Sequence, residues 1–381
     1  MKEIGIGIIG FGFMGKTHTY GYKTIPLYYD KLPFKIRLVG VCDSIAGTAE
    51  YAKEMLGFEF ATTNPDDIFN CADISVINVC TPNIYHKDAV LKGLQAGKHV
   101  YCDKPLAASF AETKEITDVL SNYASITQMA LQYRFFPVSM RAKELIDEGR
   151  IGNPLSFRVS YLHSGSVDPT KPLGWKQDKK FGGGGVLYDL GSHALDLVYY
   201  LLGEYQDIFA RTKVLYKQRP DRNGNLVDVE ADDIALIMAN TKSGAIGTIE
   251  ASKIATGTND EMRVEIHGDK GALRFNLMEP NYLEFYDNAL PDCPLGGEKG
   301  YTRIECCQRF YKPGGSFPSS KFSIGWIRAH VHSLYNFLDC VQNGRQASPS
   351  FLDGAYIQYI MEKAYESDSL ARWVTTDSLS R

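Results

Sequence analysis

The first fifteen residues carry the feature that most constrains how this chain can fold. Lys2–Ile9 is a short apolar stretch that predicts a strand, and a helix is predicted from Lys16 to about Ile25. The residues between them have the spacing G-x-G-x-x-G: Gly10, Phe11, Gly12, Phe13, Met14 and Gly15. Glycines at this spacing permit a tight turn, let a pyrophosphate approach the backbone and let the helix pack on the strand. Because the helix N-terminus also offers free N–H groups, the pattern predicts a dinucleotide-binding turn at the start of an α/β domain.

Length and composition narrow the class of protein further. The 381 residues, 44% of them hydrophobic, are enough to bury two cores. The net charge of −4 and the lack of a basic patch argue against nucleic-acid binding, and no stretch has the roughly 18–20 apolar residues of a membrane helix. Eight cysteines without a C-x-x-C pair are typical of a reduced compartment, and a chain that starts in a charged residue and a strand predicts no signal peptide. We therefore expect a cytoplasmic protein without membrane, nucleic-acid or metal partners.

The order of the predicted elements divides the chain into two domains. In residues 1–131 strands alternate with helices, which is typical of a Rossmann domain with a doubly wound parallel sheet. Residues 132–381 contain consecutive strand candidates separated by glycine turns, which predict an α+β domain with a large, mainly antiparallel open sheet. We expect helices at Ser192–Leu202, His330–Asn343 and Phe351–Leu370 to cover one face of that sheet. The segment Pro291–Ser320 is rich in Gly, Pro and Ser and is expected to be a long surface loop or arm.

Polar residues follow several predicted parallel strands, at the sheet edge where such folds bind ligands. Asp43 ends the second strand, where an acidic side chain accepts hydrogen bonds from the adenosine ribose and favours NAD over NADP. The alternative for Asp43 is a solvated cap of the next helix, and the two roles are compatible. Thr81, Pro82 and Asn83 follow the third strand, with His86 three residues further on. This group is expected to line the ribose and pyrophosphate of the cofactor.

Two further motifs place charged groups where a hydroxyl can react. Lys104 lies between Asp103 and Pro105 after the fourth strand; beside a nicotinamide, its cation would polarise a sugar hydroxyl and lower the hydroxyl's pKa. Asp189 and His193 are four residues apart, so in a helix they would share one face. An imidazole oriented by a carboxylate is a plausible base for a hydroxyl proton. The alternatives are a surface lysine, a capping aspartate and a packed histidine.

Three motifs together resemble the Gfo/Idh/MocA family, which includes glucose–fructose oxidoreductase and inositol dehydrogenase. They are GFGFMG at the start, GKHVYCDKPLA at residues 97–107 and GGGGVLYDLGSHALD at residues 182–196, and the resemblance covers essentially the whole chain. The family usually has Glu-Lys-Pro where this chain has Asp103-Lys104-Pro105, which keeps the carboxylate but shortens it by one methylene. Segments 325–330, 349–354 and 369–374 resemble the branch that contains levoglucosan dehydrogenase and enzymes oxidising glycosides at C3.

This resemblance implies roles for individual residues. His193 would take the hydroxyl proton as hydride leaves for nicotinamide C4, Lys104 would orient the hydroxyl, and Asp189 would bind a neighbouring hydroxyl or tune the histidine. For His330, a histidine packed at a helix start is an equal alternative to substrate contact. The expected cofactor-binding residues are Gly10 to Gly15, Asp43, Thr81, Pro82, Asn83, His86, Asp103, Lys104 and Gln132. The expected substrate-binding residues are Tyr133, Arg134, Tyr161, Trp175, Asp189, His193 and His330.

The resulting prediction is an NAD-dependent dehydrogenase that oxidises a ring secondary hydroxyl, with C3 favoured, of a sugar, glycoside or cyclitol. Two alternatives stay open at this point: a redox-assisted glycosidase that reduces NAD only transiently, and a non-catalytic NAD(H) sensor. The exposed face of a large antiparallel sheet needs a cover, and family relatives dimerise or form tetramers through it. The resemblance therefore implies a homo-oligomer.

Overall fold

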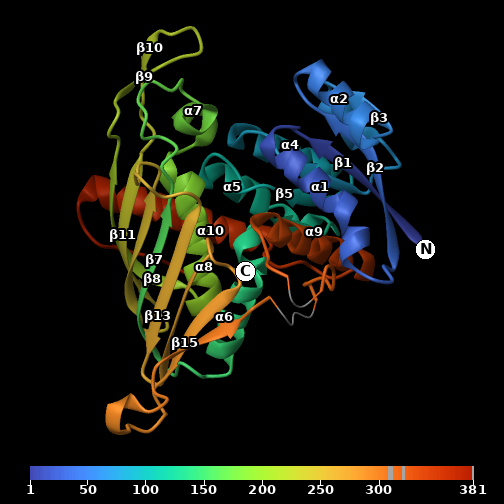
Figure 1. Cartoon of the computed structure of the whole chain (residues 1–381). Helices are drawn as coiled ribbons and strands as arrows, with labels where there is room; N and C mark the ends of the chain where they lie inside the picture. Colours follow the sequence, from blue (N-terminus) through green and yellow to red (C-terminus); the bar gives the residue numbers. More distant parts are fainter. Residues whose placement is uncertain (308–311, 320–321, 380–381) are drawn as a thin grey trace. The chain divides into compact units, whose positions relative to one another are not determined.

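The computed structural model describes residues 1–307, 312–319 and 322–379, in which the chain forms two compact units (Figure 1). The first unit comprises Met1–Gln132, Tyr311–Ser319 and Trp326–Gln358. The second comprises Tyr133–Phe310, Ser320–Gly325 and Tyr359–Arg381. In the described part of the chain, no helix is both long enough and apolar enough to span a bilayer.

The first unit contains a six-stranded sheet in the order β3-β2-β1-β4-β5-β6, and all of its strand pairs are parallel. The predicted doubly wound parallel sheet is therefore confirmed. The strands are β1 (Lys2–Ile9), β2 (Phe34–Cys42), β3 (Phe60–Thr62), β4 (Val76–Val79), β5 (His99–Cys102) and β6 (Thr127–Met129). The helices are α1 (Phe13–Tyr28), α2 (Ala46–Leu56), α3 (Pro65–Asn70), α4 (His86–Gln95) and α5 (Phe110–Thr117), with short 3₁₀ turns η1 (Asn83–Tyr85), η2 (Leu120–Asn122) and η3 (Gln132–Phe135).

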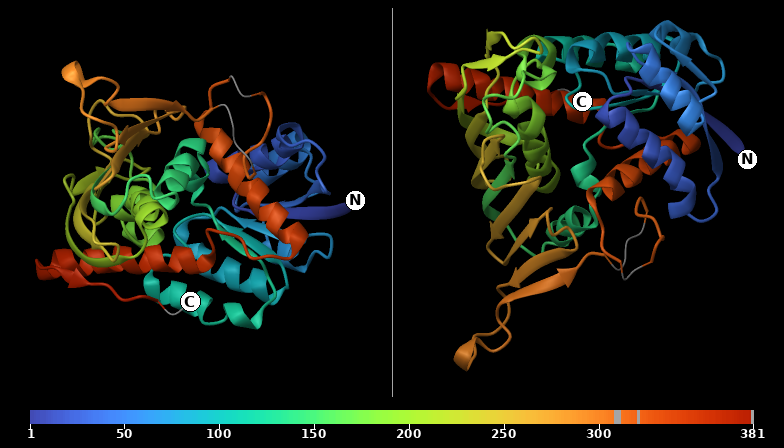
Figure 2. Two further views of the ribbon diagram at one scale, coloured as in Figure 1. Left: turned by 90° about the horizontal axis from the view of Figure 1, so that it is seen from below. Right: turned by 45° about the horizontal axis from the view of Figure 1, so that its top comes forward.

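A helix from late in the sequence packs in this first unit. Helix α9 (Trp326–Asn343) lies along α1 (Figure 2). Gly21 of α1 makes room for Leu334, since a Cβ at Gly21 would lie 2.5 Å from the Leu334 Cδ1 atom. Tyr29 and Tyr335 stack with ring centroids 3.6 Å apart. Helix α9 was expected to cover the sheet of the second domain. It instead completes the core of the first unit, because its apolar face fits α1.

The second unit contains a nine-stranded sheet in the order β16-β15-β14-β13-β7-β12-β11-β8-β17. Its neighbouring strands are antiparallel except β7 and β12, so the predicted large, mainly antiparallel sheet is confirmed. The strands are β7 (Pro154–Leu162), β8 (Tyr205–Lys213), β11 (Ile234–Thr241), β12 (Ile246–Ser252), β13 (Glu261–Gly268), β14 (Gly271–Asn276), β15 (Tyr282–Asp287), β16 (Tyr301–Glu305) and β17 (Val374–Thr375). A separate hairpin joins β9 (Gln218–Pro220) and β10 (Leu226–Asp228).

Helices cover one face of the large sheet and leave the other exposed. Helix α8 (Ser192–Leu202) packs on β7 and β12, and α6 (Pro137–Asp147) packs on α8. In β11 the side chains alternate: Ala235, Ile237 and Ala239 are buried, whereas Leu236 and Met238 are exposed on the other face. The remaining helical elements are η4 (Trp175–Gln177), α7 (Lys179–Gly182), η5 (Leu187–Gly191), η6 (Pro294–Gly296) and α10 (Phe351–Leu370), which begins in the first unit and ends in the second.

Within the predicted loop Pro291–Ser320, the sequence also predicts a strand at Thr302–Cys306, and the structure has one there. The short turn η6 and the strand β16 both lie within it, and β16 pairs with β15 as an edge strand of the large sheet. Residues 308–311 and 320 of this segment lie outside the described residues. The polar sequence of the segment matches an edge strand, which needs only one paired side.

Candidate active site

The glycine turn after β1 has the geometry that a bound pyrophosphate requires. Gly10 has φ of 90°, a conformation that favours glycine, and a Cβ at Gly15 would lie 2.3 Å from the Gly10 carbonyl oxygen. A Cβ at Gly12, the residue that precedes α1, would meet no atom within 4 Å, so the space above this helix N-terminus is open. Within this turn Phe11 is buried and Phe13 is exposed. The residues therefore fit the phosphates of a dinucleotide.

Asp43 is attached to this turn at the end of β2. Its Oδ2 atom accepts a hydrogen bond from the Phe11 backbone N–H at 2.8 Å, and its Oδ1 atom accepts one from the Ile45 N–H at 2.9 Å. The carboxylate is half-buried and has further lone pairs on both oxygens. It is thus fixed beside the glycine turn, as the prediction of a ribose acceptor requires.

His86 joins two of the other predicted cofactor segments. It is fully buried, with its Nε2 atom 2.8 Å from the Thr81 carbonyl oxygen and its Nδ1 atom 2.8 Å from the Pro105 carbonyl oxygen. Burial lowers the pKa of this imidazole, whereas the two carbonyl acceptors and the nearby Asp103 charge raise it. His86 therefore positions the turns after β4 and β5, and its burial leaves no surface for the direct cofactor contact that the sequence suggested.

The two turns that His86 joins carry polar groups toward the sheet edge. The Thr81 Oγ1 atom is buried and has no hydrogen-bond partner among the described residues. Asp103 Oδ1 accepts the backbone N–H of Lys104 at 2.9 Å and fixes the turn that carries the lysine. Asn83 and Gln132 are buried, while Lys104 is half-buried.

The second unit holds Asp189 in a turn of π-helix, η5, directly before α8. The predicted α-helix begins at Ser192, and the π-helical turn that carries Asp189 runs directly into it, four residues before His193. Asp232 fixes the start of this turn, because its carboxylate accepts hydrogen bonds from the backbone N–H groups of Gly185 at 3.1 Å and Leu187 at 2.9 Å. Single π-helical turns are often found at functional sites.

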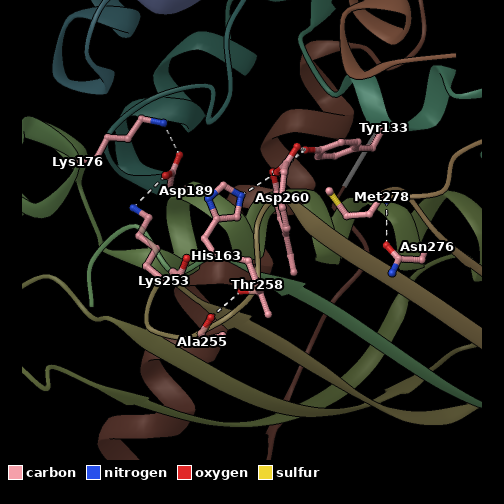
Figure 3. A network of polar contacts seen from close by, with 12 residues as sticks. Tyr133, His163, Lys176, Asp189, Lys253, Ala255, Thr258, Asp260, Asn276 and Met278 are labelled. Carbon is pink, nitrogen blue, oxygen red and sulfur yellow. Dashed lines mark hydrogen bonds and ion pairs between the residues drawn. The ribbon is translucent and has the colours of Figure 1, made fainter. Parts of the chain in front are cut away.

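The Asp189 carboxylate is bound by two ammonium groups (Figure 3). Lys176 Nζ lies 2.7 Å from Oδ1, and Lys253 Nζ lies 2.9 Å from Oδ2. The Lys253 side chain is only 12% exposed and follows β12, whereas Lys176 is 47% exposed on the η4 turn beside Trp175. Two flanking cations favour the ionised form of Asp189, which makes it an acceptor of hydrogen bonds.

His193 lies on α8 among tyrosine rings and is 5% exposed. The ring centroids of Tyr133 and Tyr161 lie 4.7 Å and 5.9 Å from that of His193, both in edge-to-face arrangements. The hydroxyl groups of both tyrosines lie within hydrogen-bond distance of the Asp260 carboxylate, which also binds His163 (Figure 3). The second unit thus holds a buried imidazole packed against two tyrosine rings, four residues after an anchored carboxylate.

Three other predicted substrate-binding residues have different surroundings. Arg134 is buried and its guanidinium forms a bidentate ion pair with Asp196, whose side chain is 2% exposed. His330 is fully buried in the first unit, against the rings of Trp326 and His18, so the packed alternative is the one the structure favours. Trp175 is 39% exposed.

Sequence reasoning did not single out His163, Lys176, Lys253 or Asp260. His163 and Lys253 each follow the last residue of a strand, and Asp260 precedes the first residue of another. The register brings these ends together: Ser252 pairs with Leu162, and Leu162 with Glu261. Polar residues at strand ends were the available signal, but only the pairing of β7, β12 and β13 shows that they meet. Among the described residues, no three His, Cys, Asp or Glu side chains form a cluster that would hold a metal ion.

Comparisons with known proteins agree with this geometry. A model of the NAD-binding Rossmann fold of an oxidoreductase family matches residues 4–130, and a model of the C-terminal alpha/beta domain of the same family matches residues 143–376. Levoglucosan dehydrogenase of Pseudarthrobacter phenanthrenivorans is 30% identical over 394 residues, with 100% of both chains covered. Glucose-6-phosphate 3-dehydrogenase of Bacillus subtilis is 28% identical over 377 residues, with 97% of both chains covered. A solved structure of levoglucosan dehydrogenase with NADH and levoglucosan has a TM-score of 0.93 at 30% identity, covering 99% of this chain and 100% of that chain.

Proposed function

The chain belongs to the Gfo/Idh/MocA family of NAD-dependent oxidoreductases, and we propose that it oxidises one secondary ring hydroxyl, at C3, of a sugar, glycoside or cyclitol to the ketone. Its relatives are dehydrogenases of sugars and inositols. The site of oxidation is the finer part of the proposal, and the relative whose name specifies a 3-dehydrogenase supports it.

One observation carries this proposal: a buried histidine, held by two tyrosine rings, follows a carboxylate that two lysines keep ionised. A neutral imidazole of fixed orientation is suited to accept a hydroxyl proton, and an ionised carboxylate is suited to accept a hydrogen bond from a neighbouring hydroxyl. A polyol presents both kinds of hydroxyl. A nucleotide-binding sensor would need neither group.

In the proposed reaction each group has one task. His193 accepts the hydroxyl proton while the hydride on the same carbon leaves, so that a CH–OH group becomes C=O. NAD supplies the acceptor for that hydride at nicotinamide C4. Lys104, on the turn fixed by Asp103, orients the hydroxyl and stabilises negative charge as it develops on the oxygen. Asp189 accepts a hydrogen bond from an adjacent hydroxyl and selects its position on the ring.

The proposal assigns the cofactor to the first unit. The open N-terminus of α1 would bind the pyrophosphate, Asp43 would accept the ribose hydroxyls, and the turn that carries Thr81 would line the cofactor. His86 has the role of positioning the turns around it.

We also propose that a second copy of the chain covers the exposed face of the large sheet. Across that face runs a row of alternating charges, Arg158, Glu265, Arg274, Glu284 and Arg303, each paired with the next by strand register. The exposed apolar side chains of Leu236, Met238 and Ile246 lie on neighbouring strands of the same sheet. Light scattering after gel filtration should give a dimer or tetramer, and a monomer at micromolar concentration would contradict this.

All eight cysteines are free, which supports a reducing, cytoplasmic location.

The activity is tested by absorbance near 340 nm with NAD and a panel of levoglucosan, glucose, aryl glucosides and inositols. NADH should form with one class of compound and not with the His193→Ala variant, which should still bind NADH. Aglycone release without NADH would instead support a redox-assisted glycosidase. NADH binding without reaction on any compound would support a sensor.

A further inference from the structure

Asp260 is a carboxylate that the proposed reaction does not use. It lies in the turn just before β13 and is half-buried. Its Oδ1 atom accepts hydrogen bonds from the Tyr161 hydroxyl at 2.6 Å and from His163 Nε2 at 2.8 Å (Figure 3). The Tyr133 hydroxyl lies 2.5 Å from that of Tyr161 and 3.4 Å from each Asp260 oxygen. One carboxylate therefore binds side chains from two separate segments of the second unit, the turn η3 that carries Tyr133 and the end of β7.

The two tyrosines connect Asp260 to His193, because their rings contact the imidazole. Tyr133 and Tyr161 are 2% and 4% exposed, and their rings cross at 90° with centroids 5.5 Å apart. Both rings contact the His193 imidazole edge to face. Since aromatic contacts of this kind depend on ring geometry, the orientation of His193 depends on where the two hydroxyl groups are held. Asp260 is the group that holds them.

The charges in the network give its hydrogen bonds a fixed direction. Burial tends to raise the pKa of Asp260, but the hydrogen bonds from His163 and Tyr161 hold that pKa below its ordinary value. Burial raises the pKa of Tyr161 well above its ordinary value, so Tyr161 donates to an ionised Asp260. The Tyr161 oxygen is then the acceptor for Tyr133. A proton arriving on His193 therefore places its positive charge beside two tyrosine rings backed by a carboxylate.

We propose that Asp260 is a positioning residue for the proposed dehydrogenase, fixing the orientation of His193 through Tyr133 and Tyr161 and favouring its protonated form. This inference rests on the proposed function, in which His193 is the base. Other charged groups of the second unit that belong to this part of the fold are Asp189, with its partners Lys176 and Lys253, and His163, which binds Asp260 directly. A purely structural Asp260 would affect folding but not the ionisation of His193.

The test compares two variants of the network with a matched control. Asp260→Asn removes the negative charge, and Tyr161→Phe removes one hydroxyl but keeps the ring. Asp269→Asn is the control, because Asp269 follows the same strand β13 at its other end and accepts hydrogen bonds from the Asn153 backbone and side chain at 2.8 Å. All three variants lose hydrogen bonds beside β13, but only Asp260 and Tyr161 belong to the network that contacts His193.

For Asp260→Asn we expect kcat to fall about tenfold, equivalent to about 1.4 kcal/mol, with KM for NAD unchanged. Since loss of the carboxylate disfavours the imidazolium, the acidic limb of the kcat/KM profile should move about one unit to lower pH. Tyr161→Phe should shift it in the same direction by less, Asp260→Glu should restore most of the rate, and Asp269→Asn should leave the profile unchanged. If Asp260→Asn loses thermal stability like the control but keeps its rate and pH profile, the proposal is wrong.

A second readout separates this inference from the proposed function. If the wild-type protein oxidises no compound of the panel, the proposed function fails, but the His193 imidazole can still be titrated by NMR in protein with ¹³C-labelled histidine. The His193 signal is assigned as the one missing in His193→Gln. A titration midpoint lower in Asp260→Asn than in wild type and Asp269→Asn would support the role of Asp260. An unchanged midpoint would overturn it.

Discussion

Four histidines should make the first unit sensitive to mild acid. His18, His86 and His330 are fully buried, and neither ring nitrogen of His330 has a hydrogen-bond partner among the described residues. His99 accepts the Ile126 backbone N–H through Nδ1 at 3.0 Å, which requires that nitrogen to be unprotonated. Burial lowers the pKa of all four imidazoles below the ordinary value, and that of His330 well below it.

The sign and size of the effect follow from these pKa shifts. A histidine whose pKa is lower in the folded state stabilises the fold fully above its unfolded pKa of about 6.5, and this stability is lost as the pH falls below that value. Between about pH 7.5 and 5.5, each histidine that stays neutral in the folded protein costs about 1.4 kcal/mol. Of the four, His330 has the pKa that burial lowers furthest, so it should contribute most of this loss, and the other three contribute in the same direction.

The assay is urea unfolding followed by circular dichroism at these two pH values. A His330→Leu variant should reduce the pH-dependent loss by about 1.4 kcal/mol relative to wild type, because one group no longer takes up a proton on unfolding. His267→Gln is the control, since His267 is partly exposed and lies in the second unit. An equal free energy of unfolding at both pH values, or an unchanged loss in His330→Leu, would refute the reasoning.

Three further predictions concern single side chains. Asp43→Ala should weaken NADH binding about tenfold and NADPH binding less, measured by fluorescence titration; an unchanged ratio of the two would contradict the ribose role. Lys253→Met removes a positive charge near Asp189, which makes protonation of His193 easier. The acidic limb of the kcat/KM profile should therefore move to higher pH, opposite to the shift expected for Asp260→Asn; a shift in the same direction would refute the charge argument. Asp196→Leu should destabilise the protein by about 3–5 kcal/mol in thermal unfolding, because it leaves the buried Arg134 guanidinium without its carboxylate; a loss below about 1 kcal/mol would show that the pair is not needed.

The fold was largely predictable because its patterns are local. The helices Phe351–Leu370 and Ser192–Leu202 have the predicted bounds. The strands β1 and β5 also begin and end at the predicted residues. Helix α9 begins at Trp326, four residues before the predicted start at His330. The short elements β3, α3, β9, β10 and β17 were missed, because two to six residues carry too little periodicity to distinguish them from loops.

The site was predictable only where a motif lies in one stretch of sequence. The glycine turn and the pair Asp189 and His193 come from contiguous motifs, and the structure gives each a defined geometry. Asp260, Lys253 and His163 come from strand ends that meet only through sheet register, which periodicity does not determine. The roles of the predicted site residues in catalysis and binding stay predictions that the variants above test.

The most direct test of the proposed reaction follows the hydrogen at the oxidised carbon. The best substrate of the panel is prepared with deuterium at C3 and incubated with NAD, and the NADH formed is analysed by mass spectrometry. The proposed reaction predicts NADH that carries the deuterium, and none from the His193→Ala variant. Unlabelled NADH would show that a different carbon is oxidised, and turnover of the substrate without any NADH would contradict a net dehydrogenation.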